Sequence, residues 1–250
     1  MKKVGVYNLK GGVGKSTAAV NLACLAARDG DRTLLWDLDP QGAAGYYLGA
    51  AASAKQGSRK LILGSQSLGE LAVETRYPNL DIVPARLSYR NIDLRLEQRR
   101  RPRSAVKEII DALPAAYRWV FLDCPAGISL LSESVFRAVD LLLVPLVPTP
   151  LSIRAFEEIV FFFQKKKLAR GRILPFFSLV ERRKKIHRET MEIFRAREER
   201  VLRSIIPSLS DIERMAVTRR PVAYYRPRSE AGRVFRALWD EVREELSGAR

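Results

Sequence analysis

A glycine-rich stretch near the start of the chain constrains its fold more than any other feature: Asn8-Leu9-Lys10-Gly11-Gly12-Val13-Gly14-Lys15-Ser16-Thr17. It follows an apolar, β-prone run (Val4 to Tyr7) and opens a good helix (Ala18 to Arg28), so the order is strand, loop, helix. Glycines let backbone N–H groups turn toward phosphate oxygens without Cβ clashes, and the helix start adds partial positive charge. The stretch predicts a site for a nucleoside triphosphate.

Two lysines mark this loop. We expect Lys15 to reach the β and γ phosphates and the Ser16 hydroxyl to take a Mg²⁺ position. The first glycine of the usual G-x-x-x-x-G-K-[ST] pattern would fall at Leu9, and a second lysine, Lys10, precedes the glycine pair instead. A plain glycine-rich turn with two solvated lysines would not require this order of strand, glycines, Lys-Ser and helix. The predicted nucleotide-binding residues are Lys10, Gly11, Gly12, Val13, Gly14, Lys15, Ser16 and Thr17.

The composition indicates a polyanionic partner. The 250 residues are 47% hydrophobic and 29% charged, as in a globular protein with a sizeable core, but the net charge is +16. That excess favours nucleic acid first and an acidic membrane surface second. Cys24 and Cys124 suggest neither a disulfide framework nor a zinc site, and the single histidine, His187, excludes a His cluster. Without a signal peptide or an apolar run approaching a membrane span, we expect a cytoplasmic protein.

Two acidic boxes follow the glycine loop. The run Arg32 to Asp37 reads as a buried strand and leads into Asp37-Leu38-Asp39-Pro40-Gln41-Gly42. In open α/β folds, ligands bind where parallel strands end, so these carboxylates should face the ligand. Four apolar residues from Trp119 end in Asp123, the Walker B form, in which a buried strand delivers a carboxylate to the metal. The first box alone could be a polar turn capping a strand, and many buried strands end in Asp. After a phosphate loop, Asp123 predicts a carboxylate at the metal.

The remaining pattern predicts one doubly wound α/β domain over residues 1–250. Leu141 to Val147 is apolar throughout, which indicates a strand covered on both faces and so a mostly parallel sheet with helices on both sides. No linker or internal repeat interrupts the alternation. Residues 50–79 are poorly periodic, and we expect helix plus loop there. Further strands are predicted at 80–85 and 173–180, and helices at 104–113, 152–168 and 230–246.

These motifs resemble the ParA/MinD family of deviant Walker A ATPases, in particular its small ParA-type partition members. The form K-G-G-V-G-K-S-T is similar to the family's Walker A box, and D-x-D-P-Q-G to its switch I. Residues 119–127 are similar to its Walker B and switch II, where the family commonly has D-x-P-P and this chain has Ala126. The segment 221–229 with the helix after it is similar to the family's closing strand, turn and helix.

The resemblance implies a role for each motif residue. Lys10 would cross a dimer interface to the phosphates of the partner subunit, and Asp39 would orient the attacking water. Adenine contacts would fall loosely at 178–181. The implied catalytic residues are Lys10, Lys15 and Asp39, and the implied metal-site residues are Ser16, Asp37 and Asp123.

The resemblance also implies a function: an ATP-dependent sandwich homodimer that binds DNA non-specifically and positions a plasmid, chromosome or protein assembly. A ParB-like or cargo adaptor protein would stimulate its slow hydrolysis, and it would associate with the nucleoid. The alternative is a MinD-like membrane-associated regulator, although the short amphipathic tail of such relatives looks absent after Leu246, so no membrane is expected. Small-molecule ligases, iron–sulfur reductases and GTPases of the superfamily lack supporting motifs here.

Basic residues concentrate in the second half of the chain. From Lys165 to Arg228 there are 19 Lys/Arg against 7 Asp/Glu, and no helix-turn-helix or zinc finger accompanies them. Phosphate contacts need only such clustered charge, so sequence-independent DNA binding is predicted; the alternative is a solvated face paired with nearby glutamates. The predicted DNA-binding residues are Arg182, Arg183, Lys184, Lys185, Arg188, Arg214, Arg219 and Arg220. A separate basic run, 95–103, could equally be a solvated loop or a binding patch.

Overall fold

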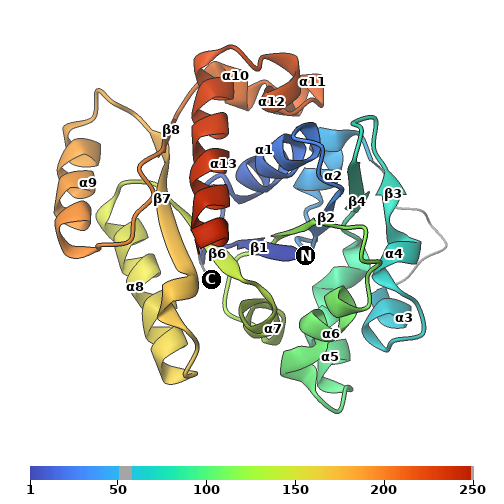
Figure 1. Cartoon of the computed structure of the whole chain (residues 1–250). Helices are drawn as coiled ribbons and strands as arrows, with labels where there is room; N and C mark the ends of the chain where they lie inside the picture. Colours follow the sequence, from blue (N-terminus) through green and yellow to red (C-terminus); the bar gives the residue numbers. More distant parts are fainter. Residues whose placement is uncertain (51–57, 249–250) are drawn as a thin grey trace.

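The computed structural model describes residues 1–50 and 58–248, and their strands form one sheet (Figure 1). The strand order is β3-β4-β2-β5-β1-β6-β7-β8, and every neighbouring pair is parallel except the antiparallel pair β3–β4. The predicted α/β class with a mostly parallel sheet is therefore confirmed. The strands are β1 (Lys2–Val6), β2 (Thr33–Asp37), β3 (Val73–Glu74), β4 (Leu80–Val83), β5 (Trp119–Asp123), β6 (Leu141–Leu146), β7 (Ile173–Val180) and β8 (Ile205–Pro207).

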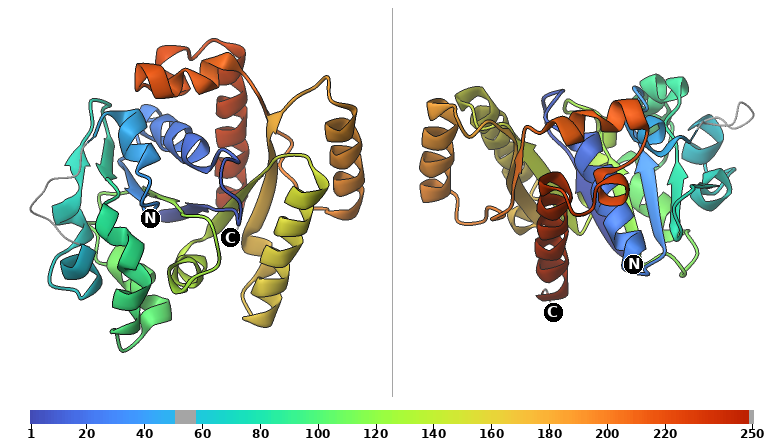
Figure 2. Two further views of the ribbon diagram at one scale, coloured as in Figure 1. Left: turned by 180° about the vertical axis from the view of Figure 1, so that it is seen from behind. Right: turned by 90° about the horizontal axis from the view of Figure 1, so that it is seen from above.

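Helices cover both faces of this sheet (Figure 2). The first layer contains α1 (Lys15–Arg28), α2 (Ala43–Leu48), α10 (Ser210–Glu213), α11 (Met215–Thr218), α12 (Val222–Tyr225) and α13 (Glu230–Gly248). The second layer contains α3 (Ser58–Ile62), α4 (Leu68–Leu71), α5 (Ile92–Glu97), α6 (Ala105–Asp111), α7 (Leu130–Ala138), α8 (Pro150–Lys165) and α9 (Lys185–Arg197). Short 3-10 turns lie at η1 (Leu87–Asn91), η2 (Pro102–Ser104) and η3 (Arg170–Arg172).

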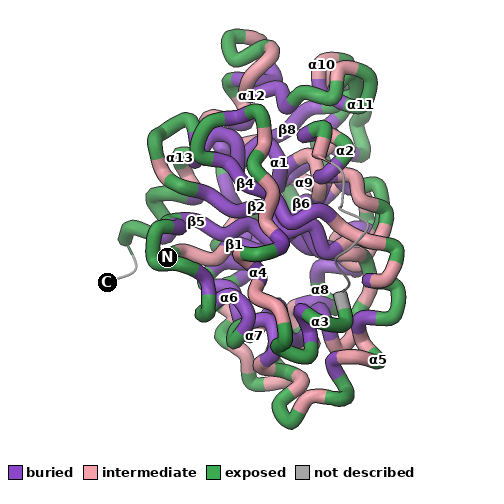
Figure 3. Tube along the Cα trace, turned by 90° about the vertical axis from the view of Figure 1, so that its right-hand side faces the viewer, coloured by how far each residue is buried: buried purple, intermediate pink, exposed green. Residues whose placement is uncertain are grey.

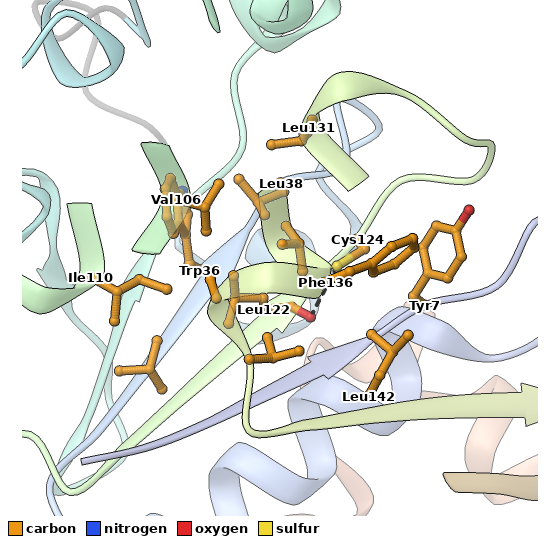
Figure 4. Packing of buried hydrophobic residues seen from close by; sticks show 14 of the residues in the cluster. Tyr7, Trp36, Leu38, Val106, Ile110, Leu122, Cys124, Leu131, Phe136 and Leu142 are labelled. Carbon is orange, nitrogen blue, oxygen red and sulfur yellow. Dashed lines mark hydrogen bonds between the residues drawn. The ribbon is translucent and has the colours of Figure 1, made fainter. Parts of the chain in front are cut away.

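Alternate residues of each central strand enter the two layers. In β5, Val120 and Leu122 pack with the second layer, and Phe121 packs with the first. The central strands and α1 are buried almost throughout (Figure 3). On the second-layer side, the ring of Phe136 in α7 meets Tyr7 edge to face, with ring centroids 4.8 Å apart (Figure 4). Because each buried aromatic or aliphatic side chain contributes about 1.5–3 kcal/mol, the two layers hold the sheet rigidly.

The C-terminal region differs from the prediction in one element. The segment 221–229 was expected to include a strand, but Val222–Tyr225 forms the short helix α12. Pro221 precedes its first turn, and Val222 and Ala223 are buried against the α1 side of the sheet. The last helix turns an apolar stripe into the core: Val234 is half-buried, and the rest of the stripe is buried, namely Phe235, Leu238, Trp239, Val242 and Leu246.

The region predicted as helix plus loop, residues 50–79, is only partly described. Residues 51–57 lie outside the described residues. The rest contains the helices α3 and α4 and the edge strand β3. The poorly periodic sequence did not predict this strand. Across residues 1–50 and 58–248, no helix combines the length and the apolarity that a membrane crossing needs.

Gly232 allows α13 to begin close to the turn before it. A Cβ at this position would lie 2.5 Å from the carbonyl oxygens of Arg226 and Pro227, and backbone atoms cannot give way as a flexible side chain can. We expect Gly232→Ala to lower the free energy of unfolding by about 1–3 kcal/mol, the usual cost of overpacking, in urea denaturation. The matched control is Gly69→Ala in α4, whose Cβ would meet nothing nearer than 3.7 Å. Equal stabilities of the two variants would contradict the steric argument.

Candidate functional site

The glycine loop joins the end of β1 to the start of α1. Gly12 and Gly14 have φ angles of 72° and 90°, in the left-handed region that favours glycine. A Cβ on Gly14 would also lie 2.8 Å from the Ser178 hydroxyl. Gly14 is the N-cap of α1, and no side chain caps this helix. The first N–H groups of α1 therefore point toward a place where phosphate oxygens could accept them.

Hydrogen bonds hold the backbone of Lys10 on both sides. Asn8 is fully buried; its side-chain oxygen accepts the Lys10 N–H at 2.9 Å, and its Nδ2 donates to the Pro145 carbonyl at 2.7 Å. On the other side, the buried Lys15 ammonium donates to the Lys10 carbonyl at 3.0 Å. Asn8 was not among the predicted site residues. The signal that could have found it is a polar residue at the very end of an apolar strand.

Asp37 and Asp123 lie side by side at the ends of adjacent strands. β2 and β5 are parallel neighbours whose register pairs these two residues, and both are fully buried. Asp37 accepts backbone N–H groups from Asp39 at 3.2 Å and Gly45 at 3.1 Å. Neither carboxylate oxygen of Asp123 has a hydrogen-bond partner in the structure. The sheet thus brings together two carboxylates that are about 86 residues apart in the chain.

Burial is the main cause that raises the pKa of both carboxyl groups. For Asp123 burial is the larger cause and the charge of Asp37 the second, while Ser16 and Lys15 act in the opposite direction. For Asp37 burial again dominates, and its backbone hydrogen bonds oppose the shift. Such a pair favours a bound cation, and hard oxygen ligands suit Mg²⁺. Within the described ranges no group of three His, Cys, Asp or Glu could hold a metal alone, so phosphate and water oxygens would have to complete the coordination.

The other predicted residues of this region border the same edge. Asp39 is half-buried, and its carboxylate accepts the Gln41 N–H at 3.0 Å, which shapes the turn after β2. In the region expected to contact adenine, Ser178 and Leu179 line a cavity of about 20 Å³ together with Gly14 and Thr17. The end of β7 therefore lies against the loop, but this cavity is far too small for a base.

The chain matches the model of one known protein family. A family model described as an AAA domain matches residues 1–172, well over half of the chain. The chain belongs to this family. With the motifs above and the named relatives that follow, it is a member of the ParA/MinD group of deviant Walker A ATPases.

Two curated relatives of this ParA/MinD-family protein carry the names ParA and Soj. It is 32% identical over 149 residues to the chromosome partitioning protein ParA of Caulobacter vibrioides, which covers 58% of this chain and 56% of that protein. It is 25% identical over 247 residues to the sporulation initiation inhibitor protein Soj of Bacillus subtilis, covering 96% of this chain and 98% of Soj. The chain thus spans just over half the length of the first relative and nearly all of the second.

Two solved structures share the fold over nearly the whole chain. A plasmid partition protein of Borrelia burgdorferi bound to AMPPNP, described as putative, has a TM-score of 0.86 at 18% identity and covers 98% of this chain and 99% of its own. Cobyrinic acid a,c-diamide synthase of Mycobacterium smegmatis, with a bound ATP analogue and magnesium, has a TM-score of 0.82 at 22% identity and covers 100% and 97%. Because a partition protein and a synthase match almost equally well, this likeness shows the fold alone.

All eight predicted DNA-binding residues of this ParA/MinD-family protein are exposed. They form two zones, 182–188 at the start of α9 and 214–220 at α10 and α11. The first zone contacts the start of α13, because Arg182 pairs with Glu230 at 3.0 Å. In the second zone, Arg219 lies over the ring of Tyr46 in α2, 4.6 Å from its centroid. Some of the cations also have local partners, such as Lys185 with Glu189 at 3.4 Å.

Asn8 provides a test of the loop network. We expect Asn8→Ala to lower the free energy of unfolding by about 1–3 kcal/mol, because it leaves the Lys10 N–H and the Pro145 carbonyl without a partner. It should also weaken binding of a nucleoside triphosphate, measured by titration calorimetry. The matched control is Asn21→Ala in α1, an equally buried asparagine whose bonds to Thr17 and Ala223 do not touch Lys10. Equal loss of nucleotide affinity in both variants would contradict a specific role for Asn8.

His187 makes the first basic zone sensitive to pH. Its buried Nδ1 accepts the Glu181 N–H at 3.1 Å, and burial, followed by the charge of Lys184, lowers its pKa. The unfolded chain then binds a proton more readily than the folded one, so stability is complete above the ordinary histidine pKa and is lost as pH falls below it. We expect wild type to lose more stability than His187→Asn, which does not titrate, between about pH 7.5 and about pH 5.5. Equal losses of stability in wild type and His187→Asn over this pH range, measured by urea denaturation, would contradict this prediction.

Proposed function

We propose that this protein is a Mg²⁺-dependent, ParA-like ATPase that works as a nucleotide-gated DNA-binding dimer. The observation that carries the proposal is the buried pair Asp37 and Asp123 beside a glycine loop that opens a helix. Phosphoryl transfer needs positioning and charge neutralisation more than covalent chemistry, and these groups supply both. The nucleotides bound to the Borrelia and Mycobacterium proteins support ATP as the substrate, and the magnesium of the latter supports the cation.

Each residue of the site has a defined task in this proposal. The N–H groups of residues 11–17 bind phosphate oxygens, and the Lys15 ammonium moves from the Lys10 carbonyl to the β and γ phosphates. Ser16, Asp37 and Asp123 hold Mg²⁺ directly or through water. When bound, the cation neutralises charge on the phosphates. Asp39 orients the attacking water from the turn after β2.

Lys10 completes the site of a second subunit. It is half-buried and is followed by the exposed glycines Gly11 and Gly12, so its side chain starts at the protein surface. The Asn8 and Lys15 hydrogen bonds fix the peptide from which it extends. A dimer with ATP between the subunits would let each Lys10 neutralise phosphates of the other. A ParB-like or cargo adaptor protein that orders this arrangement would raise the hydrolysis rate.

The basic zones at 182–188 and 214–220 would bind the phosphate backbone of DNA. Dimer formation would double the number of cations that face one duplex. Because phosphate contacts carry no sequence information, binding would be non-specific. Hydrolysis would release the dimer, and repeated cycles on the nucleoid would position a plasmid, chromosome or protein assembly in the cytoplasm.

The test measures binding to non-specific duplex DNA with ATP, with ADP and without nucleotide, over a range of salt concentrations. We expect ATP to strengthen binding of the wild type, and binding to fall steeply with salt as counterions are released. Lys10→Ala and Lys15→Ala should abolish the gain from ATP, because the first breaks the dimer contact and the second the phosphate contact.

Lys107→Ala is the matched control, since it removes one lysine charge from α6, where Lys107 pairs with Asp111 away from the loop. It should keep the gain from ATP. Affinity for DNA that ATP does not change would overturn the proposal. ATP-dependent sedimentation with anionic liposomes would then favour the MinD-like alternative.

A further inference from the structure

A second group of cations surrounds Glu133 in the helix layer that contains α7 and α8. The Glu133 side chain is only 7% exposed, and three cations contact its carboxylate: Arg103 at 3.0 Å, Arg137 at 3.1 Å and Lys166 at 3.0 Å. They come from η2, α7 and the end of α8. Their contacts keep the pKa of Glu133 below its ordinary value despite its burial. We call these four residues the Glu133 cluster.

The Glu133 cluster retains positive charge, because three cations share one carboxylate. Arg103 keeps 55% of its side chain exposed while it contacts Glu133. Further exposed cations flank the cluster in the chain, namely Arg100, Arg101, Lys165 and Lys167. In the described part of the chain, the neighbouring helix α6 has no carboxylate shared by three cations in this way. Its Glu108 pairs with Arg99, and its Asp111 pairs with Lys107. The surplus of charge is therefore local to the cluster and its flanks.

This surface is separate from the zone at α10 and α11. Those helices pack in the layer of α1 and α13, whereas α7 and α8 pack on the opposite face of the sheet. Two helix layers and the sheet between them amount to roughly 30 Å, since a helix with its side chains is about 10 Å across. One straight duplex cannot lie against both surfaces at once. The basic run at 95–103, for which the sequence left two interpretations open, ends in this cluster.

We propose that the Glu133 cluster and its flanking cations form a second nucleic-acid surface, which binds the phosphate backbone of duplex DNA without requiring a nucleotide. Contacts within one chain assemble the cluster, and none of them involves the glycine loop. The buried carboxylate holds the cations in place, so little side-chain freedom is lost when phosphates bind. A folded protein partner would need an apolar centre for stable binding, whereas phosphates need only the charges.

This inference goes beyond the ATP-gated binding proposed above and does not depend on it. Because the Glu133 cluster and the zone at α10 and α11 lie on opposite faces of the sheet, a single subunit could contact two DNA segments. The test uses the full chain without nucleotide and a labelled short duplex at low salt, followed by fluorescence anisotropy. In Arg101→Glu with Lys165→Glu we expect about tenfold weaker binding and a salt slope smaller by about 2, as for two lost phosphate contacts. Both side chains are exposed, so the fold should be kept, which circular dichroism checks.

The matched control is Arg219→Glu with Arg220→Glu, which changes the net charge equally in the zone at α10 and α11, where both side chains are exposed. This control should leave DNA binding without nucleotide nearly unchanged and reduce only the increase in affinity that ATP produces. Failure of this inference can therefore be told apart from failure of the ATP-gated proposal. Equal weakening by both pairs would mean that net charge alone acts and would overturn the second surface. So would unchanged binding in Arg101→Glu with Lys165→Glu. Displacement of the duplex by polyglutamate at equal charge would overturn it in favour of an acidic protein partner.

Discussion

The burial of Asp37 beside Asp123 is the constraint on which the rest of this site depends. Burial raises the pKa of both carboxyl groups, and the charge of Asp37 adds to the shift at Asp123, so a bound cation would favour their ionised forms. The parallel register of β2 and β5 aligns the two residues. A divalent cation with its phosphate ligands would offset the burial of these two carboxylates.

The glycine loop is coupled to the same edge of the sheet through Asn8. One amide side chain joins the backbone of Lys10 to the end of β6, and Lys15 holds the opposite side of the same peptide. The polypeptide after β6 leads within a few residues to α8, which begins at Pro150. Two hydrogen bonds of Asn8 therefore link the backbone of Lys10 to β6, which leads into the second helix layer.

The distribution of cations is as informative as their number. Many of the 44 Lys and Arg side chains have a nearby carboxylate, as in α6, where such pairs contribute little beyond solubility. The Glu133 cluster departs from this pattern, because one buried carboxylate contacts three cations and cannot cancel their charge. Cations that are held in place and keep a net positive charge can bind a phosphate backbone.

The sequence by itself determined the elements whose signals are local. The glycines, Lys15 and Ser16 between an apolar strand and a helix predicted the phosphate loop, and apolar runs ending in Asp37 and Asp123 predicted two buried strands, because backbone freedom and hydrophobic periodicity act within a few residues. Only the tertiary structure decided which strands are neighbours, that Asn8 bonds to Pro145, that Pro221 begins a helix instead of a strand, and that Glu133 gathers cations from three elements. Those features depend on contacts between residues far apart in the chain, and such contacts form only when the sheet and both helix layers pack together.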